Sequence, residues 1–324
     1  MLSISEYREA FVDYLNEKIV TREPVNLYEP ITYILNLGGK RLRPVLVLMT
    51  AEIFDTSYKK ALDAALAIEV FHNFSLVHDD IMDAAPLRRG KETVHEKWDL
   101  NTGILSGDAM LINAYQLFEN YEGDVFKELA QLFTKTAIEV CEGQQYDIDF
   151  ESREDVEIAD YLKMIEFKTA VLVGASLQMG AIVAGASEDC KKSMYEFGRL
   201  LGIAFQLQDD YLDAFGDPES FGKQLGGDII ENKKTFLYLT ALEKAGKAEA
   251  RQLEHLYTIS PIDATGKIEA VKGIFEQSGA SDLARKEIRK YTKEAFDVLE
   301  KIEMPEDRKL LLRKFGESLM DRQV

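Results

Sequence analysis

The sequence contains little cysteine and little proline. Its 324 residues include two cysteines, seven prolines and 21 glycines. The prolines and glycines are scattered, so no segment has the composition of a flexible linker or a low-complexity region. The two cysteines, Cys141 and Cys190, lack the spacing of a metal site. We interpret both as reduced thiols and expect a cytoplasmic protein, because a single structural disulfide is uncommon in a chain of this size.

Positive charge is also scarce. The chain carries 39 lysines and arginines against 57 aspartates and glutamates, which is a formal net charge of −18. Nucleic acids and anionic membrane surfaces select basic proteins, so we expect neither as a partner. A small anionic ligand is compatible with this charge, because a local cluster of cations or a metal ion is enough to bind it.

A strongly apolar run without polar residues is absent as well. The N-terminal segment MLSISEYREAFVDYLNEKI has charges in its first turns, so no signal peptide is expected. Residues 169–187 carry no charge, but they include Gln178, two serines, a threonine and three glycines. That composition is weakly apolar for a membrane span. We therefore expect a buried helix there and no membrane span.

Helical periodicity dominates the sequence. Apolar side chains recur at spacings of three and four through residues 62–77, 129–140, 159–173, 194–207 and 288–302. No segment alternates apolar and polar residues over a length typical of a strand. Short breaks such as NLGGKRLRP and AAPLRRGK separate the helical segments. The pattern predicts an all-α fold, a single large helical bundle in one domain that spans residues 1–324.

Two aspartate motifs follow apolar helical segments. The motif DDIMD at residues 79–83 recurs as DDYLD at residues 209–213. The first and last carboxylates of each motif are four residues apart and project from one face of a helix, where like charges destabilise it unless a cation lies between them. Carboxylate oxygens favour Mg²⁺ or a similar hard ion. One such motif is compatible with a solvated helix end, whereas two of them predict a metal site.

Lysines and arginines gather at the breaks beside these motifs. They are Lys40, Arg41, Arg43, Arg88, Arg89, Lys168, Lys223, Lys233 and Lys234. Any single pair is more commonly a solvated surface feature. Their position beside both motifs indicates phosphate binding, for which arginine forks and lysine point charges are suited. Two groups of cations would serve two anionic substrates. Among the four histidines, we expect His72 to contact a substrate and His78 to be structural.

Five motifs resemble, in the same order, those of the trans-isoprenyl diphosphate synthases. They are GGKRLRP, DDIMDAAPLRRGK, FKT, FQLQDDYLD and a later GK…NKK, and together they run from Gly38 to Lys234. The resemblance implies an all-α fold around a deep central cavity, usually in a homodimer. It also implies head-to-tail condensation of isopentenyl diphosphate with an allylic diphosphate, which is dimethylallyl, geranyl or farnesyl diphosphate. The proton would leave with the departing pyrophosphate, in agreement with the lack of an obvious side-chain base.

The resemblance also implies roles for individual residues. Asp79, Asp83 and Asp209 would hold three Mg²⁺ ions, while Asp80 and Asp213 would act through water or neighbouring hydrogen bonds. The other candidates are Arg88, Lys168, Lys223 and Lys233 for the allylic diphosphate, Gly39, Lys40, Arg43, His72 and Arg89 for isopentenyl diphosphate, and Thr169 and Gln206, with Lys168, at the reacting centre. The chain departs from the family pattern at Glu92, where proline is usual, and at its C-terminus, where MDRQV has only one cation.

The helix that leads into the first motif provides a ruler for product length. Phe74 and Phe71 lie about 7 and about 12 Å before Asp79 along the helix axis. Ser75 is small and one turn before Asp79. This arrangement resembles short-chain synthases and favours a twenty-carbon product, geranylgeranyl diphosphate, with the fifteen-carbon farnesyl diphosphate next. Alternatively, Phe74 only packs between helices.

Two other functions share some of these features. A class I terpene cyclase also uses an aspartate-rich motif and Mg²⁺, but it needs no second diphosphate site, so GGKRLRP and the paired arginines count against it. A non-catalytic subunit of a prenyl synthase would not need two complete aspartate motifs.

Overall fold

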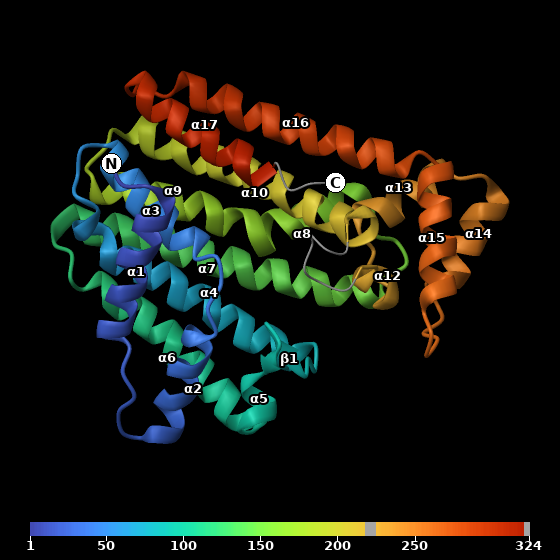
Figure 1. Cartoon of the computed structure of the whole chain (residues 1–324), viewed down its shortest axis with the longest axis horizontal. Helices are drawn as coiled ribbons and strands as arrows, with labels where there is room; N and C mark the ends of the chain where they lie inside the picture. Colours follow the sequence, from blue (N-terminus) through green and yellow to red (C-terminus); the bar gives the residue numbers. More distant parts are fainter. Residues whose placement is uncertain (218–224, 321–324) are drawn as a thin grey trace. The chain divides into compact units, whose positions relative to one another are not determined.

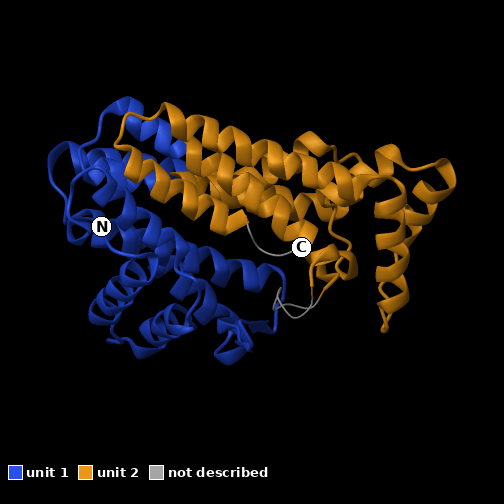
Figure 2. Ribbon diagram, turned by 45° about the horizontal axis from the view of Figure 1, so that its top comes forward, with its two compact units in different colours: residues 1–136, 175–195 blue, residues 137–174, 196–324 orange. Residues whose placement is uncertain are grey.

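The computed structural model describes residues 1–217 and 225–320, and helices dominate it (Figure 1). The chain divides into two compact units, residues 1–136 with 175–195 and residues 137–174 with 196–324 (Figure 2). The boundaries between the units fall inside three helices, α7 (Gly123–Ser152), α9 (Val171–Val183) and α10 (Glu188–Phe215). The all-α expectation is confirmed, and the expectation of one domain over residues 1–324 stays a prediction.

The first unit contains the N-terminal elements. They are α1 (Ile4–Lys18), α2 (Val25–Asn36), α3 (Leu42–Ile53), the 3₁₀ turn η1 (Tyr58–Ala61), α4 (Leu62–Met82), β1 (Leu87–Arg88), β2 (Lys91–Glu92), α5 (Val94–Lys97) and α6 (Leu100–Phe118). Helices α3 and α4 are buried along most of their length. Helices that are apolar on most sides belong in the centre of a core.

Helix α1 illustrates how the local sequence builds these elements. The hydroxyl of Ser3 accepts from the backbone N–H of Glu6 at 3.3 Å, and the carboxylate of Glu6 accepts from the backbone N–H of Ser3 at 2.7 Å. This capping box satisfies two N–H groups that the helix leaves without partners. Tyr7, Phe11 and Leu15 follow at intervals of four residues and are all buried. The apolar stripe of the sequence is thus the face of α1 that enters the core.

A short hairpin follows α4 and was not expected from the sequence. Strands β1 and β2 pair in antiparallel fashion, and the turn between them consists of Arg89 and Gly90 at φ 54° and 74°. Two successive positive φ values are typical of a type I′ turn, whose twist suits a two-residue hairpin loop. Strands of two residues are too short to show alternation in a sequence, which is why the pattern predicted none.

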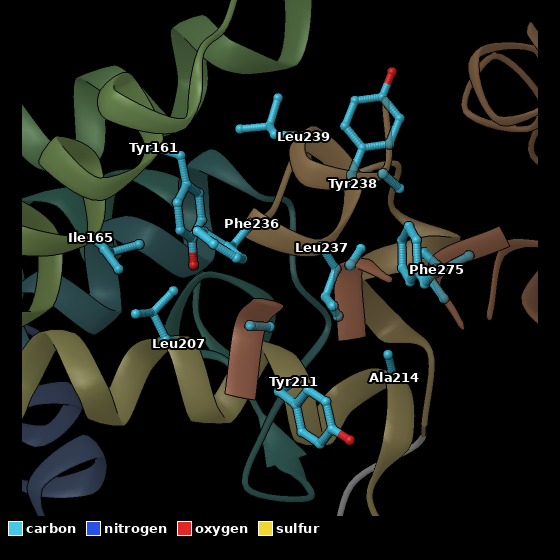
Figure 3. Close-up of a cluster of buried hydrophobic side chains, with 14 of the residues drawn as sticks. Tyr161, Ile165, Leu207, Tyr211, Ala214, Phe236, Leu237, Tyr238, Leu239 and Phe275 are labelled. Atoms are coloured by element: carbon cyan, nitrogen blue, oxygen red, sulfur yellow. The ribbon is translucent and has the colours of Figure 1, made fainter. Parts of the chain in front are cut away.

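The second unit contains most of the C-terminal elements. They are α8 (Ile158–Ile165), the π-helical turn η2 (Glu166–Ala170), α12 (Gly227–Ile230), α13 (Phe236–Lys244), α14 (Lys247–Leu256), α15 (Thr265–Gln277), α16 (Ala280–Lys301) and α17 (Glu306–Met320). Figure 3 shows its core, in which side chains from α8, α10, α13 and α15 meet. Lys234 stabilises the C-terminal end of α7, because its Nζ donates to the carbonyl oxygens of Phe150, at 2.8 Å, and Arg153.

The uncharged segment lies in a largely buried helical run. In the described part of the chain, Ile158–Val183 is the run long and apolar enough to cross a membrane by length and composition. In the structure 72% of its most apolar window is buried. A core helix passes the same test of length and composition, so the expected buried helix is present and no membrane span is shown.

Candidate active site

Helix α4 ends at the first aspartate motif. Its last turn is closed by two backbone hydrogen bonds, from Ala84 N–H to Ile81 O at 3.2 Å and from Ala85 N–H to Asp80 O at 2.9 Å. Ala84 adopts the left-handed conformation at φ 48°. This is the Schellman type of helix ending. It leaves Asp83 exposed at the helix end.

Arg88, from the hairpin, binds the first motif. Its Nε and Nη2 donate to Asp80 at 2.8 and 2.5 Å, and its Nη2 lies 3.5 Å from Oδ2 of Asp79. The side chain of Asp80 is 1% exposed, whereas that of Asp79 is 18% exposed. Burial raises the pKa of Asp80, and the hydrogen bonds and charge of Arg88 act against that rise. Asp80 is therefore bound mainly to Arg88, while Asp79 and Asp83 present the more exposed carboxylates.

The GGKRLRP motif, residues 38–44, forms the end of the loop between α2 and α3 and the first residues of α3, and it contains several left-handed residues. Gly38, Gly39 and Arg41 have φ values of 82°, 119° and 52°. Arg41 is 6% exposed, and its guanidinium pairs with the buried carboxylate of Glu69 and donates to the carbonyl oxygen of Leu35. A buried ion pair with further hydrogen bonds is costly to break. Arg41 therefore holds the backbone of the loop.

Arg43, His72 and Arg89 form what we call the arginine corner. Nη1 of Arg43 lies 3.2 Å from Nε2 of His72. Because a guanidinium only donates, Nε2 of His72 accepts, and the imidazole is neutral. Burial lowers the pKa of His72 well below its usual value, and the charges of Arg43 and Arg89 lower it further. The corner thus concentrates positive charge on its two arginines.

The arginine corner has the features of an anion site. Among the described residues, no carboxylate forms an ion pair with Arg43 or Arg89, and Nε of Arg43 is buried without a hydrogen-bond partner. Burial lowers the pKa of both guanidinium groups. A buried donor without a partner calls for a ligand that accepts. An anion would supply both the acceptors and the missing negative charge.

Gly39 allows the arginine corner to form. A Cβ atom at this position would lie 2.9 Å from the guanidinium atoms of Arg89, and Nη1 of Arg89 donates to the carbonyl oxygen of Gly38. Only glycine fits both this close approach and a φ of 119°. Lys40 is exposed on the same loop. The first unit therefore brings Gly39 close to Arg89 and Arg43 close to His72, and their assignment to one substrate stays a prediction.

The π-helical turn η2 carries the FKT motif of the second unit. Turns of this type are frequent at functional sites. Nζ of Lys168 lies 2.5 Å from Oδ2 of Asp147 on α7. A Cβ atom on Gly143 would lie 2.2 Å from the backbone nitrogen of Lys168. Gly143 therefore allows α7 to contact η2 closely, and Asp147 orients the lysine.

A chain of four hydrogen-bonded side chains links η2 to α10. The hydroxyl of Thr169 donates to Oε1 of Gln206 at 3.1 Å, and Nε2 of Gln206 donates to Oδ1 of Asp210 at 2.8 Å. The hydroxyl of the buried Tyr161 donates to Oδ2 of Asp210. Thr169 and Gln206 are thus in direct contact, and their place at a reacting centre stays a prediction. Tyr161 and Asp210 complete the chain, and no pattern in the sequence indicated that they take part in it.

The second aspartate motif lies on α10 and uses its carboxylates differently. Asp209 is partly buried, whereas Asp210 is buried. Burial raises the pKa of Asp210 to about 6, against the hydrogen bonds from Tyr161 and Gln206. Asp213 accepts from the backbone N–H groups of Gly227, at 3.2 Å, and Asp228, at 3.1 Å. It thereby holds the start of α12.

Two further charged residues lie beside this motif. Burial, followed by the charges of Asp210 and Asp213, raises the pKa of Asp228 to about 8. Burial disfavours the charged form of Lys233. Nζ of Lys233 lies 3.0 Å from the carboxylate of Glu231, and the negative charges of Glu231 and Asp228 raise the pKa of the lysine overall. Lys233 therefore stays protonated beside the second motif. Lys223, the other lysine expected here, lies outside the described residues.

The donor set of both motifs suits Mg²⁺. Among residues 1–217 and 225–320, no three His, Cys, Asp or Glu side chains form a group that could hold a metal ion alone. Each motif instead offers carboxylate oxygens one helical turn apart. Mg²⁺ commonly takes one or two carboxylates and completes its octahedron with water and substrate phosphate oxygens. The residues therefore fit an ion that arrives together with a phosphate ligand.

The candidate chain-length residues lie on α4 in an aromatic cluster. We define this aromatic cluster by its rings, which are Phe71, Phe74, Tyr115, Phe118 and Phe133. Phe74 is 8% exposed, and its ring centroid lies 5.5 Å from that of Phe71, which is fully buried. Phe71 in turn packs edge-on against Phe133 at 5.1 Å. Ser75 donates back to the carbonyl oxygen of His72 at 2.8 Å within the helix.

Several residues of the site could not be assigned from the sequence. They are Asp147, Tyr161 and Asp228, together with the specific roles of Arg41 and Asp210. A tyrosine in an apolar stripe is predicted to be an ordinary core residue, and a single aspartate in a chain with 57 acidic residues does not indicate a functional site. Arg41 and Asp210 lie inside recognised motifs, but the sequence does not show that they are buried while the adjacent Lys40 and Asp209 are more exposed.

Comparison with known proteins places this geometry in a family. The polyprenyl synthetase family model matches residues 24–275. The chain is 38% identical over 276 residues to a geranylgeranyl diphosphate synthase of Methanosarcina mazei, covering 82% of this chain and 85% of that protein.

Solved structures agree with the sequence match. One, of a geranylgeranyl pyrophosphate synthase, superposes with a TM-score of 0.96 at 52% identity and covers all of both chains. Another, a geranylgeranyl pyrophosphate synthase of Corynebacterium glutamicum complexed with isoprenyl diphosphate and magnesium, gives a TM-score of 0.84 at 26% identity, covering 99% of this chain and 98% of that one.

Proposed function

The chain belongs to the polyprenyl synthetase family, and on that premise we propose that it makes geranylgeranyl diphosphate. The reaction is the head-to-tail condensation of isopentenyl diphosphate with an allylic diphosphate, and it depends on Mg²⁺. Farnesyl diphosphate as the main product is the alternative.

The observation that carries this proposal is the presence of two separate sets of cations in the first unit. Arg88 is bound to the carboxylates of the first aspartate motif. The arginine corner has no such carboxylate among the described residues. One set therefore suits a diphosphate that shares metal ions with aspartates, and the other suits a diphosphate held by cations alone. A terpene cyclase, which takes a single diphosphate, has no use for the second set.

In this proposal the metal ions supply Lewis-acid stabilisation of the departing diphosphate. Asp79, Asp83 and Asp209 would bind three Mg²⁺ ions. Asp80 and Asp213 would act indirectly, which agrees with their hydrogen bonds to Arg88 and to the start of α12.

The remaining residues bind and orient the two substrates. Preorganised donors stabilise charge on a leaving group without having to reorganise during the reaction. The residues proposed for the allylic diphosphate are Arg88, Lys168, Lys223 and Lys233, and those for isopentenyl diphosphate are Gly39, Lys40, Arg43, His72 and Arg89. Thr169 and Gln206 would face the reacting carbons, and the proton would leave with the pyrophosphate.

The proposed assembly is a cytoplasmic homodimer in which each chain is one domain around a central cavity. Exposed apolar side chains on α6 support the dimer: Ile104, Leu105 and Ile112 are 40%, 59% and 58% exposed. Their spacing places them along one side of the helix, where a second chain would cover them. Light scattering of the purified protein tests the proposal, and a monomer at micromolar concentration would contradict it.

Product analysis tests the function. The protein is incubated with Mg²⁺, labelled isopentenyl diphosphate and each allylic diphosphate in turn, and the dephosphorylated alcohols are separated by chromatography. We expect a twenty-carbon alcohol that requires isopentenyl diphosphate. A product that forms equally well without isopentenyl diphosphate would indicate a cyclase. No product with any primer would indicate a non-catalytic subunit.

A further inference from the structure

Tyr161 is a buried tyrosine whose hydroxyl donates to a carboxylate of the second aspartate motif. We propose that Tyr161 is a positioning residue for the condensation. Through Asp210 it orients the amide of Gln206, and through Gln206 it orients the hydroxyl of Thr169. This inference rests on the proposed function, because it concerns the reacting centre of that reaction.

The direction of each hydrogen bond follows from the groups involved. Oδ2 of Asp210 accepts from Tyr161, and Oδ1 accepts from Nε2 of Gln206 at 2.8 Å. With its NH₂ group turned to Asp210, Gln206 presents its carbonyl oxygen to Thr169 at 3.1 Å. A threonine hydroxyl has one hydrogen to donate and lone pairs that accept. Its hydrogen goes to Gln206, so the lone pairs of Thr169 remain for a ligand.

Tyr161 is the fixed end of this chain. Its side chain is 1% exposed and packs beside Phe236, with ring centroids 6.4 Å apart. Figure 3 shows its ring between Ile165 and Phe236, with the hydroxyl directed towards the helix that carries Leu207. A hydroxyl buried in this way cannot hydrogen-bond to bulk water, and leaving a buried donor unpaired lowers the stability of the fold. Its bond to Asp210 is therefore strongly favoured.

The backbone supports the other end of the chain. A Cβ atom on Gly202 would lie 2.7 Å from Cα of Ala170, so α10 and η2 approach each other closely. This contact lies four residues before Gln206 and one residue after Thr169, which places both side chains within reach of each other. The chain from Tyr161 to Thr169 is thus a closed link between α8, α10 and η2.

The orientation of Thr169 matters for a reaction that develops positive charge on carbon. When the allylic carbon–oxygen bond breaks, the bonding electrons leave with the diphosphate, and the allylic fragment becomes a cation. A preoriented oxygen lone pair stabilises that charge, whereas a hydroxyl hydrogen turned to the same place opposes it. If the amide of Gln206 were flipped, its NH₂ group would donate to the hydroxyl oxygen of Thr169. The hydroxyl hydrogen of Thr169 would then be free to turn towards the reacting carbons. Tyr161 therefore acts on the rate and not on substrate affinity.

The test is a double-mutant cycle on the single-turnover rate of condensation. Tyr161→Phe removes only the hydroxyl, and we expect the rate to fall about tenfold, equivalent to about 1.4 kcal/mol, with the KM of both diphosphates unchanged. Tyr238→Phe is the control, since Tyr238 is buried in the same core cluster. In the Thr169→Val background, Tyr161→Phe should have no further effect, whereas in the Thr169→Ser background it should again reduce the rate about tenfold.

Several results would overturn the inference. The first is an unchanged single-turnover rate in Tyr161→Phe, and the second is an equal loss of rate in Tyr161→Phe and Tyr238→Phe. The third is a double variant Tyr161→Phe/Thr169→Val whose loss of rate is the product of the two single losses. Asp210→Leu removes both acceptors of the chain and should show the same dependence on Thr169, so the cycle does not rely on one variant folding. A wild-type protein without condensation activity would instead contradict the proposed function.

A separate cycle needs no turnover. Urea unfolding of Tyr161→Phe, Asp210→Leu and the double variant should show coupling between the two residues, because leucine has a similar size but no acceptor, so both changes remove the same hydrogen bond. Additive losses of stability would show that the bond is absent and would overturn the inference even if the enzyme is active.

Discussion

Replacing Phe74 by alanine should lengthen the product by one prenyl unit. Of the two rings that α4 contributes to the aromatic cluster, that of Phe74 is the nearer in sequence to the aspartate motif, five residues before Asp79. The next ring on α4, that of Phe71, lies three residues earlier, or about 4.5 Å along the helix axis. A prenyl unit adds four carbon–carbon bonds of about 1.5 Å, or roughly 5 Å in extended form. Removing the first ring therefore makes room for one unit, and Phe71 stops a second.

The assay combines product length with stability. The alcohols from Phe74→Ala are chromatographed beside those of the wild type, and we expect the main product to shift from twenty to twenty-five carbons. Unfolding in urea is measured in parallel, because removing a buried phenylalanine ring destabilises a protein by about 3–5 kcal/mol. The Phe74 variant should fall at the lower end of that range, since its ring is 8% exposed and not fully buried.

Phe118→Ala is the matched control. Phe118 is fully buried in the same cluster and packs against Phe133, with ring centroids 5.1 Å apart. It should lose comparable stability and keep the wild-type product. An unchanged product in Phe74→Ala would show that another residue limits chain length. A longer product in both variants would show that general loosening, and not a specific floor, sets the length.

Three further predictions concern other parts of the site. Asp79→Asn should reduce condensation by roughly 10²–10³-fold and raise the Mg²⁺ concentration required, and an unchanged Mg²⁺ titration would contradict its role as a ligand. Arg41→Ala should lower the free energy of unfolding by about 3–5 kcal/mol, because it leaves the carboxylate of Glu69 buried without its partner; a loss within the error of urea unfolding would contradict the buried pair. The stability of the wild type should fall as the pH drops below 6.5, because the unfolded chain binds a proton on His72 that the folded chain does not; the same slope in His72→Asn would refute this.

Much of the fold follows from local patterns. The stripes at residues 62–77, 129–140, 194–207 and 288–302 fall within α4, α7, α10 and α16, apart from one terminal residue. The stripe at residues 159–173 is helical too, although it is interrupted by the π turn η2. Periodicity reports which face of a helix is apolar, but a single extra residue in one turn leaves that pattern almost unchanged. The π turn is in close contact with Gly143, which lies on α7, so the periodicity of residues 159–173 holds no information about this contact.

The sequence by itself determined which residues share a helix face and which charges stand at helix ends. Asp79 and Asp83 are four residues apart on one chain segment, so their common direction needs no tertiary information. Only the tertiary structure decided that Arg88 binds Asp80, that Arg41 is buried against Glu69, and that Tyr161 reaches Asp210. The partners in these pairs are between eight and 49 residues apart in sequence. Their contacts depend on how separate elements pack, and helical periodicity carries no information about that.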